Sequence, residues 1–264
     1  MRGNPGIGNL SWRFIRVWNR NMVVYRKIWF VNFLVPLLEP VLYIAAFGIG
    51  LGALIGRVNY HGAPVSYVVF IAPALVAITI MYNSFFENTY ASFVRMYYQK
   101  TFDAMMTTPL SLEDIIAGEI FWGATKSVIA AATVLAVLSC FRLVEYPMGL
   151  LVLPLSFLGG LAFGTVGMIF TGLTPSIDMY NLPIFLFITP MFLFSGTFFP
   201  LSALPGWAQK LALTLPLTHL VNLCRAFCLG EPAADLIWSV IYIAVMFILL
   251  FPVALIVMRR RLIS

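Results

Sequence analysis

The chain has 264 residues, of which 61% are hydrophobic and 10% are charged, and its formal net charge is +6. A soluble domain is closer to half apolar and a quarter charged, so a soluble globular fold is excluded. Several apolar runs reach the roughly 20 residues that a helix needs to cross a bilayer, which predicts an all-α polytopic membrane protein with one domain, residues 1–264.

The positive charge is gathered in short segments beside the apolar runs. Eleven of the sixteen Lys and Arg residues fall in three such segments: Arg2, Arg13, Arg16, Arg20, Arg26 and Lys27; Arg95 and Lys100; and Arg259, Arg260 and Arg261. This is the positive-inside pattern, so we expect both termini in the cytoplasm and no nucleic-acid partner. The first 30 residues have no short apolar core before a small-residue cleavage site, so no cleavable signal peptide is expected.

Residues 10–30 predict an amphipathic helix. Apolar side chains recur at steps of three and four residues: Ile15, Trp18, Met22, Tyr25 and Trp29. Basic side chains follow the same steps but are displaced by two residues, or about 200° around a helix. Two opposite stripes favour a helix that lies in the membrane interface over a basic flank that only orients the first span.

The first of six predicted spans covers residues 31–55 and contains Glu39. An ionisable group inside a span is a candidate functional residue. Lys126, in the third span, is one possible partner, so Glu39 and Lys126 are candidate intramembrane charges. The alternative is that Glu39 lies near the inner interface and caps or pairs locally, since the sequence offers few other charges from which to build a proton relay.

Residues 65–90 predict the second span, and the coupling segment, residues 95–111, belongs to the longest loop on the basic side. A short helix is expected over residues 97–106, and Ser111 with Asp114 resembles a capping box at the start of the next helix. The short helix carries five apolar side chains: Tyr97, Tyr98, Phe102, Met105 and Met106. These are too apolar for a solvated hairpin, so we predict that the segment docks against a soluble partner or lipid headgroups.

The remaining predicted spans cover residues 115–140, 149–173, 182–199 and 235–258, and Gly160 with Gly164 predicts close helix packing in the fourth. Residues 200–230 are too polar for a span and too apolar for a solvated loop. Pro200, Pro205 and Pro216 divide this stretch, which predicts two short helices, residues 202–214 and 217–229, on the outer side. Such broken backbone is tolerated at membrane depth where protein or a cavity covers it, so a re-entrant pair is expected.

The sequence contains no P-loop, no Gly-x-Ser-x-Gly and no His-Glu-x-x-His motif. Cys224 and Cys228 lie one helical turn apart and are interpreted as packing residues, and a metal pair with His219 is a weaker alternative. No catalytic residue, cofactor site or metal site is therefore expected. A membrane pathway with a docking surface and no energy source predicts a subunit driven by a separate protein.

Two other classes of protein fit the sequence less well. A stand-alone secondary transporter or channel would use Glu39 and Lys126 as gating charges, but such transporters usually place more ionisable groups near the midplane. A membrane enzyme acting on lipid is disfavoured because no constellation of His, Asp or Ser is present.

Several motifs resemble those of type 2 ABC exporter permeases. The signature is carried by residues 194–200 (FSGTFFP), 204–205 (LP), 216–220 (PLTHL) and Arg225. Four further pieces are most similar to the permeases that export lipo-chitooligosaccharides: residues 56–58 (GRV), 102–105 (FDAM), 118–126 (GEIFWGATK) and 259–262 (RRRL). The resemblance extends over nearly the whole chain.

The resemblance implies a connecting helix at residues 10–30, a coupling helix that contains Tyr97–Met106, and a re-entrant gate that includes Gly196, Pro200, Pro205, Pro216 and Arg225. It also implies a homodimer in the bacterial inner membrane, bound to lipid and to two copies of a cytoplasmic P-loop ATPase. ATP and Mg would bind to that ATPase. The substrate class implied is amphipathic: a lipo-oligosaccharide, a glycolipid or polysaccharide, or a drug.

Overall fold

The structure, a computed structural model, describes residues 9–60, 63–230 and 236–263, and several side chains between residues 31 and 54 lie outside the described set. The elements are α1 (Phe14–Lys27), α2 (Trp29–Tyr43), the π-helical η2 (Ile44–Leu51), α3 (Gly52–Ile55), β1 (Arg57–Tyr60), β2 (Ala63–Ser66), α4 (Tyr67–Phe86), the π-helical η3 (Glu87–Ala91) and η4 (Val94–Tyr98), α5 (Thr101–Met106), α6 (Leu112–Cys140), η5 (Met148–Leu151), α7 (Val152–Leu173), η6 (Ile177–Tyr180), α8 (Asn181–Pro183), the π-helical η7 (Ile184–Ile188), α9 (Thr189–Phe194), η8 (Leu201–Ala203), α10 (Gly206–Leu213), α11 (Pro216–Leu229) and α12 (Leu236–Ile263).

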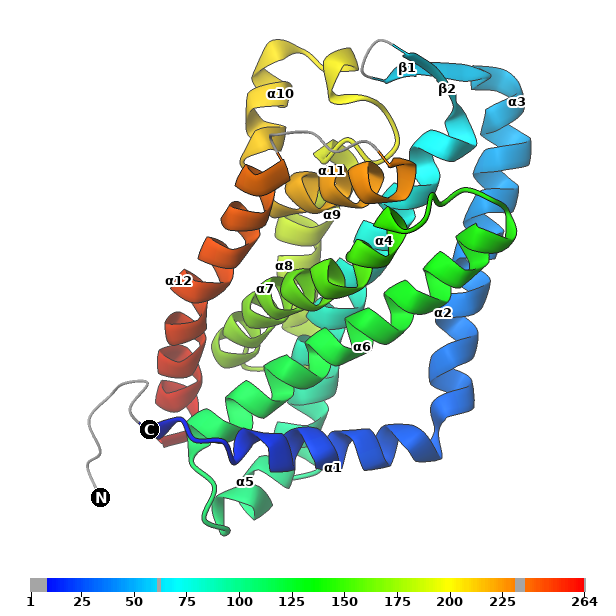
Figure 1. The fold of residues 1–264 in the computed structure, drawn as a ribbon. Helices are drawn as coiled ribbons and strands as arrows, with labels where there is room; N and C mark the ends of the chain where they lie inside the picture. The colour runs from blue at the N-terminus through cyan, green and yellow to red at the C-terminus, as the bar shows by residue number, and fades with distance from the viewer. Residues whose placement is uncertain (1–8, 61–62, 231–235, 264) are drawn as a thin grey trace.

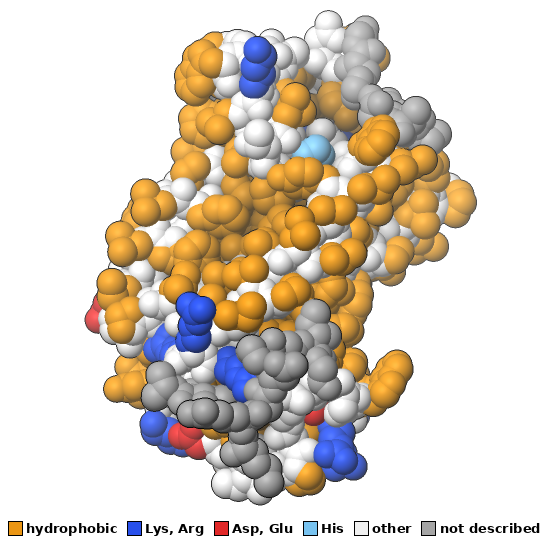
Figure 2. Space-filling view, turned by 90° about the vertical axis from the view of Figure 1, so that its left-hand side faces the viewer, with side chains coloured by type: hydrophobic (Ala, Val, Ile, Leu, Met, Phe, Trp, Pro, Cys, Tyr) orange, Lys and Arg blue, Asp and Glu red, His pale blue; other side chains and the backbone are white. Residues whose placement is uncertain are grey.

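Long helices run side by side between two distinct ends (Figure 1). One end carries α1, α5 and the last residues of α12, and we call it the basic end because most Lys and Arg side chains visible in Figure 2 lie there. The opposite end carries the β1–β2 pair and α10, and we call it the hairpin end. Between the two ends, most of the side chains on the face seen in Figure 2 are hydrophobic, as expected of a surface that faces lipid.

The all-α polytopic fold predicted from the sequence is confirmed. Among the described residues, five helices are long and apolar enough to cross a membrane: Tyr67–Tyr98, Leu112–Cys140, Met148–Leu173, Ile177–Phe194 and Leu236–Leu262. The bent pair α10–α11 would make a sixth. The expected first span, residues 31–55, falls on α2, η2 and α3, which follow one another and run along the bundle in Figure 1.

Small residues let the central helices α4, α6 and α7 approach closely. A Cβ added at Gly160 of α7 would lie 2.7 Å from Ala124 Cα of α6, and one at Gly164 would lie 2.6 Å from Ser84 Oγ of α4. The backbones therefore pack without intervening side chains, as predicted for this glycine pair. The neighbouring Thr171 Oγ1 donates to Asn88 O at 2.6 Å, so polar bonds reinforce the same contact.

The segment between the first two predicted spans forms an antiparallel hairpin, in which Val58 pairs with Val65. Two predicted boundaries were wrong in detail. The second span does not end at Tyr90 but continues through two π-helical segments to Tyr98. The short helix expected over residues 97–106 is interrupted, because Lys100 has a φ of +52° and α5 begins only at Thr101.

The face of α1 that packs on the bundle lies outside the predicted apolar stripe: Val17 is 1% exposed and Asn21 is 4% exposed. Ile15 of the predicted stripe is exposed, as a side chain that faces lipid would be. Val17 packs closely on α6, where a Cβ at Gly118 would lie 2.5 Å from Val17 Cβ. The helix crosses the bundle at a steep angle (Figure 1), the orientation expected of an interfacial helix.

Candidate functional site

Four charged side chains meet near the basic end, and we call Glu87, Arg95, Glu119 and Lys126 the charge cluster. The Glu87 carboxylate accepts hydrogen bonds from Arg95 Nη1 at 2.7 Å, Lys126 Nζ at 2.8 Å and Trp122 Nε1 at 3.0 Å. Arg95 Nε also donates to Glu119 Oε2 at 2.9 Å. The charges of two carboxylates and two cations therefore cancel within the charge cluster, which is largely buried.

Helix geometry explains why these residues meet. Glu119, Trp122 and Lys126 are spaced by three and four residues, so they share one face of α6. Glu87 and Arg95 are eight residues apart, which in a regular α-helix leaves them about 80° apart around the axis. The wider π-helical turns η3 and η4 lie between them and change this angle. Such turns often occur at functional sites, and here they bring both side chains to α6.

Burial makes the charge cluster depend on all its members. Glu87 is 6% exposed and Glu119 is 0% exposed, so neither carboxylate is stabilised by bulk water. A buried charge that loses its partner costs several kcal/mol, whereas a paired and hydrogen-bonded set is tolerated. The cluster is therefore a rigid polar connection between the end of α4 and α6.

Helix α1 is attached to the same place. Asn21 Nδ2 donates to Glu119 Oε1 at 2.9 Å, and Trp18 Nε1 donates to Thr125 Oγ1 at 2.9 Å. Arg20 Nη1 donates to Asn21 Oδ1 at 2.9 Å. Burial lowers the pKa of the Arg20 guanidinium, while the nearby Glu119 carboxylate opposes that shift. Movement of η4 or α6 would therefore reach α1 through directional bonds.

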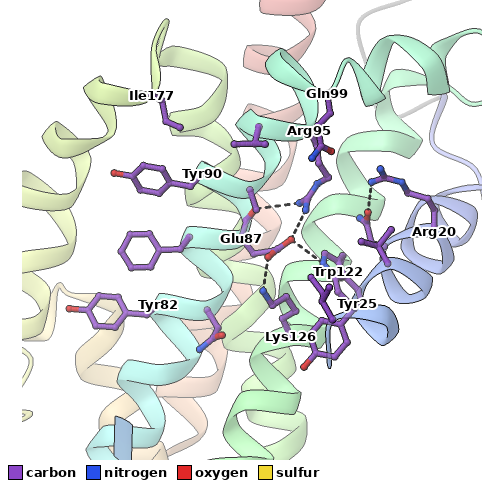
Figure 3. A pocket seen from close by; sticks show the side chains of 17 residues that line it. Arg20, Tyr25, Tyr82, Glu87, Tyr90, Arg95, Gln99, Trp122, Lys126 and Ile177 are labelled. Atoms are coloured by element: carbon purple, nitrogen blue, oxygen red, sulfur yellow. Dashed lines mark hydrogen bonds and ion pairs between the residues drawn. The ribbon is translucent and has the colours of Figure 1, made fainter. Parts of the chain in front are cut away.

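A pocket of about 880 Å³, which we call the inner pocket, lies beside the charge cluster. Its lining comes from α1, from the stretch between Tyr82 and Gln99, from α6 and from Ile177 (Figure 3). Figure 3 shows Glu87, Arg95 and Lys126 on one side of this stretch and the rings of Tyr82 and Tyr90 on the other. A pocket of this size is within the range of about 300–1,000 Å³ that is usual for ligand sites.

The predicted docking residues Tyr97, Tyr98, Phe102, Met105 and Met106 do not all lie on the surface. Tyr97 and Tyr98 are 53% and 61% exposed at the basic end. Phe102 is fully buried in the same hydrophobic cluster as Ile115 and Ile116, so it anchors α5 to α6 and cannot meet a partner directly. Met105 and Met106 are half-buried against that cluster.

The capping box predicted at Ser111 and Asp114 is confirmed. Asp114 N donates to Ser111 Oγ at 3.0 Å, and the Asp114 carboxylate accepts from Ser111 N at 3.3 Å. The same carboxylate also accepts from Ser11 N at 2.7 Å and from Ser11 Oγ at 2.9 Å. One side chain therefore starts α6 and holds the beginning of α1.

At the hairpin end, Arg225 and Gly196 of the predicted gate are brought together. Arg225 is 2% exposed, and its Nη2 donates to Gly196 O at 2.7 Å and to Thr197 O at 3.0 Å. Its Nε donates to Phe70 O at 3.0 Å, and its guanidinium carbon lies 3.8 Å from the centre of the Phe70 ring. This arginine ties α11 to α4 and to the loop after α9.

The three predicted gate prolines stand at element starts. Pro200 and Pro205 precede η8 and α10, and Pro216 is the first residue of α11. The chain bends by 85° between α10 and α11. Proline has no N–H to donate and disfavours helical backbone in the residue before it, which explains why α10 does not continue into α11.

The other candidate residues have different outcomes. The side chain of Glu39 lies outside the described residues, and Lys126 is bound to Glu87. Cys224 and Cys228 are buried free thiols. His219 lies 3.0 Å from Leu213 O and 3.1 Å from Ser239 Oγ. In the described part of the chain, no three metal-ligating side chains gather.

The sequence did not predict the charge cluster. Arg95 was expected only as part of a basic segment, and Lys126 as a possible partner of Glu39. The signal that could have revealed the cluster is the spacing of Glu119, Trp122 and Lys126, which places a carboxylate, a donor and a cation on one helical face.

Comparisons with known proteins agree over most of the chain. Residues 13–229 match the model of the family described as ABC-2 type transporter. The chain is 38% identical to Nodulation protein J of Rhizobium leguminosarum bv. trifolii over 258 residues, which covers 98% of this chain and 96% of that protein. It is 37% identical to Nodulation protein J of Rhizobium meliloti (strain 1021), covering 84% and 83% of the two chains. It is 24% identical to the Inner membrane transport permease YadH of Escherichia coli (strain K12), covering 84% and 85%.

Proposed function

Because this chain belongs to the ABC-2 type transporter family, we propose that it is the membrane permease subunit of an ATP-driven exporter. Two copies of the chain would form the membrane part, and two copies of a cytoplasmic P-loop ATPase would bind ATP and Mg and supply the energy. The absence of a P-loop motif from the sequence supports a separate energy source. The permease would lie in the bacterial inner membrane with both termini in the cytoplasm.

The observation that carries this proposal is the connection between the exposed tyrosines and the charge cluster. Tyr97 and Tyr98 lie on η4, two and three residues after Arg95, which is bound to both carboxylates of the cluster. A partner that pushes on these rings would displace Arg95 and, through Glu119, α6 and α1. Tyr97 and Tyr98 are thus suited to receive a push, while buried Phe102 keeps α5 attached to α6.

The cargo proposed is amphipathic: a lipo-oligosaccharide, a glycolipid or polysaccharide, or a drug. The exposed apolar side chains of α2 and of residues 177–194 would face lipid and are compatible with a cargo that has an acyl or other apolar part. Cargo would enter from the inner leaflet or the cytoplasm and leave at the hairpin end, where Arg225 and the bent pair α10–α11 form the closure.

The test is co-purification from native membranes in mild detergent. We expect the tagged chain to retain a P-loop ATPase, and the double variant Tyr97→Ala/Tyr98→Ala to weaken that retention by about tenfold or more, as loss of buried interface aromatics does. The control is Tyr146→Ala, which removes an exposed aromatic ring near the other end of the bundle. Retention unchanged in the double variant would contradict the docking role. Transport that survives ATP depletion would instead favour a secondary transporter.

A further inference from the structure

One positive charge at the inner pocket has no carboxylate to balance it. The pocket and the charge cluster beside it together hold three cations and two carboxylates: Arg20, Arg95, Lys126, Glu87 and Glu119. Arg95 and Lys126 lie 2.7 Å and 2.8 Å from Glu87, so both are paired. Among the described residues Arg20 makes no ion pair, and its Nη1 donates to a neutral amide oxygen. The unbalanced charge therefore lies on Arg20 of α1.

Three side chains on this side of the pocket keep hydrogen-bond donors that the described part of the chain does not use. Arg20 donates from Nη1 alone, and Lys126 uses one of its three ammonium hydrogens for Glu87. Tyr25 also lines the pocket and packs its ring edge-on against Trp122, while its hydroxyl makes no hydrogen bond to a described residue. In Figure 3, Arg20, Tyr25 and Lys126 all lie on the side of Glu87. A ligand with several acceptor oxygens would satisfy these donors together.

The pocket lies where lipid headgroups are expected. Helix α1 lines it and has the orientation of an interfacial helix (Figure 1). This helix contains four basic residues and no acidic one: Arg16, Arg20, Arg26 and Lys27. Basic segments of this kind are attracted to anionic lipid, and basic pockets between membrane helices on the cytoplasmic side bind anionic headgroups.

Apolar surface continues from the pocket along α2. Val24 and Ile28 line the pocket and are four residues apart, one helical turn. Helix α2 begins directly after Ile28, and its Leu34, Leu38 and Leu42 are exposed at the same spacing. A lipid with its headgroup in the pocket would lay its acyl chains along this stripe. A soluble anion gains nothing from such a surface, because it has no apolar area to bury.

We propose that the inner pocket holds the headgroup of an anionic phospholipid of the bilayer, with its phosphate bound by Arg20, Lys126 and the hydroxyl of Tyr25. A phosphodiester carries one negative charge, which balances the one unpaired cation, and its oxygens accept charge-assisted hydrogen bonds from all three donors. A zwitterionic lipid brings its own cation and would leave the positive charge of Arg20 uncompensated. The lipid is a resident component of the membrane and not the cargo.

The experiment measures binding of phosphatidylglycerol to the purified full chain in detergent micelles by native mass spectrometry. Phosphatidylcholine is the zwitterionic comparison. We expect saturable binding of phosphatidylglycerol and binding of phosphatidylcholine that is weaker by about fivefold or more, the effect of one uncompensated charge near lipid. Arg20→Gln should weaken binding of phosphatidylglycerol by about fivefold for the same reason.

Arg16→Gln is the matched control for Arg20. Arg16 lies four residues earlier on α1, carries the same charge and is exposed, but it does not line the pocket. This variant should bind phosphatidylglycerol as the parent chain does. Arg20→Lys keeps the charge and should retain most of the binding. Tyr25→Phe removes a hydroxyl and keeps the ring, so it should weaken binding by about fivefold, the effect of one lost hydrogen bond.

Three outcomes would overturn the proposal. Equal weakening in Arg16→Gln and Arg20→Gln would mean that α1 attracts anionic lipid by its charge without a site. Equal binding of phosphatidylglycerol and phosphatidylcholine would mean that the charge of Arg20 selects nothing. Saturable binding of glycerol 1-phosphate that is lost in Arg20→Gln, without a preference for phosphatidylglycerol, would assign the pocket to a soluble phosphate ester.

The melting temperature of each variant in micelles without added lipid separates loss of binding from loss of fold. If Arg20→Gln lowers that temperature, Tyr25→Phe decides: unchanged binding in this variant overturns the site. Neither an ATPase nor transport enters the experiment. Its result is therefore independent of the proposed export function.

Discussion

Two buried charged side chains, Glu87 and Arg225, each make several hydrogen bonds that hold different segments of the chain together. Glu87 satisfies three donors from two elements, and Arg225 satisfies three backbone carbonyls from two others. In both cases the bonds join segments that are distant in sequence. Loss of either side chain leaves several buried partners unsatisfied at once.

The first prediction concerns Glu87. The variant Glu87→Gln keeps the shape of the side chain but leaves Arg95 and Lys126 with one carboxylate between them. We expect a loss of about 3 kcal/mol in the free energy of unfolding, because a broken buried ion pair leaves an uncompensated charge. Thermal unfolding of the purified protein in micelles measures it.

The matched control for Glu87 is Asp103→Asn. Asp103 lies 3.9 Å from Lys100, and both side chains are more than half exposed. An exposed pair of this kind contributes about 0–1 kcal/mol, so the melting temperature should hardly change. Equal shifts in the two variants would mean that the charge cluster is not a stabilising unit.

The second prediction concerns Arg225. The variant Arg225→Met removes the donors that hold Phe70 O, Gly196 O and Thr197 O, so the hairpin end should open more often. The buried thiols of Cys224 and Cys228 lie on the same helix and report that opening. In a Cys140→Ser background, which removes the exposed third thiol, we expect them to react with maleimide several times faster than in the chain that keeps Arg225.

Lys210→Met is the control for Arg225, because it removes an exposed cation from the same bent pair of helices. It should leave the thiols protected. Arg225→Lys should behave like Arg225→Met, since an ammonium group is a point charge and cannot reproduce the fixed fork of a guanidinium. Thiols that stay protected in both arginine variants would contradict the role of Arg225 as a tie.

At the scale of elements, the sequence predicted the type of most segments and missed how some of them pack. Hydrophobic runs and prolines are local signals, so the long helices and the division of residues 200–230 could be predicted. The contact face of α1 could not be predicted, because Val17 is buried where Gly118 of α6, which has no side chain, leaves room for it. The hairpin after α3 was also missed, since strands of four residues, Arg57–Tyr60 and Ala63–Ser66, give too short a pattern.

The candidate site was predictable only in part for the same reason. The exposed Tyr97 and Tyr98 follow from a local apolar segment in a basic loop. The charge cluster depends instead on which face of α6 packs against the π-helical turns that carry Glu87 and Arg95. No local pattern in the sequence predicts such turns. Phe102 was misjudged because burial is a tertiary property.

The third prediction concerns the bend between α10 and α11. In Pro216→Ala the missing N–H is restored, and Leu215 is no longer kept from helical backbone by a following proline. We expect the 85° bend to relax towards a continuous helix, so ATP-driven export should fall more than retention of the ATPase does.

Pro175→Ala, in an exposed turn at the basic end, is the matched control for Pro216 and should change neither quantity. An equal loss of export and of ATPase retention in Pro216→Ala would mean that the bend serves only to fold the protein.

At the scale of the whole molecule, the charged residues and the bundle direction together make a prediction about orientation. Lys and Arg side chains gather at the basic end, and α6 runs from that end towards the hairpin end, where it finishes at the exposed Cys140. The positive-inside rule predicts that the basic end lies in the cytoplasm. The hairpin end would then face the periplasm.

The fourth prediction follows from that orientation. A maleimide that crosses the outer membrane but not the inner membrane should label Cys140 in intact cells. Asp103→Cys, introduced into a Cys140→Ser background, should react only after the inner membrane is permeabilised. Labelling of Asp103→Cys in intact cells would reverse the proposed orientation.

We expect the two roles of Asp114 to make the protein sensitive to the thickness of the bilayer. This carboxylate caps the start of α6 and accepts hydrogen bonds from Ser11, so a movement of α6 would also move α1. The energy of that movement depends on how well the thickness of the lipid matches the protein. We expect the ATPase rate of the reconstituted complex to change between short-chain and long-chain phosphatidylcholine. Ser11→Pro removes both donors to Asp114, so α1 would no longer follow α6. In this variant the ATPase rate should depend less on the length of the lipid chains.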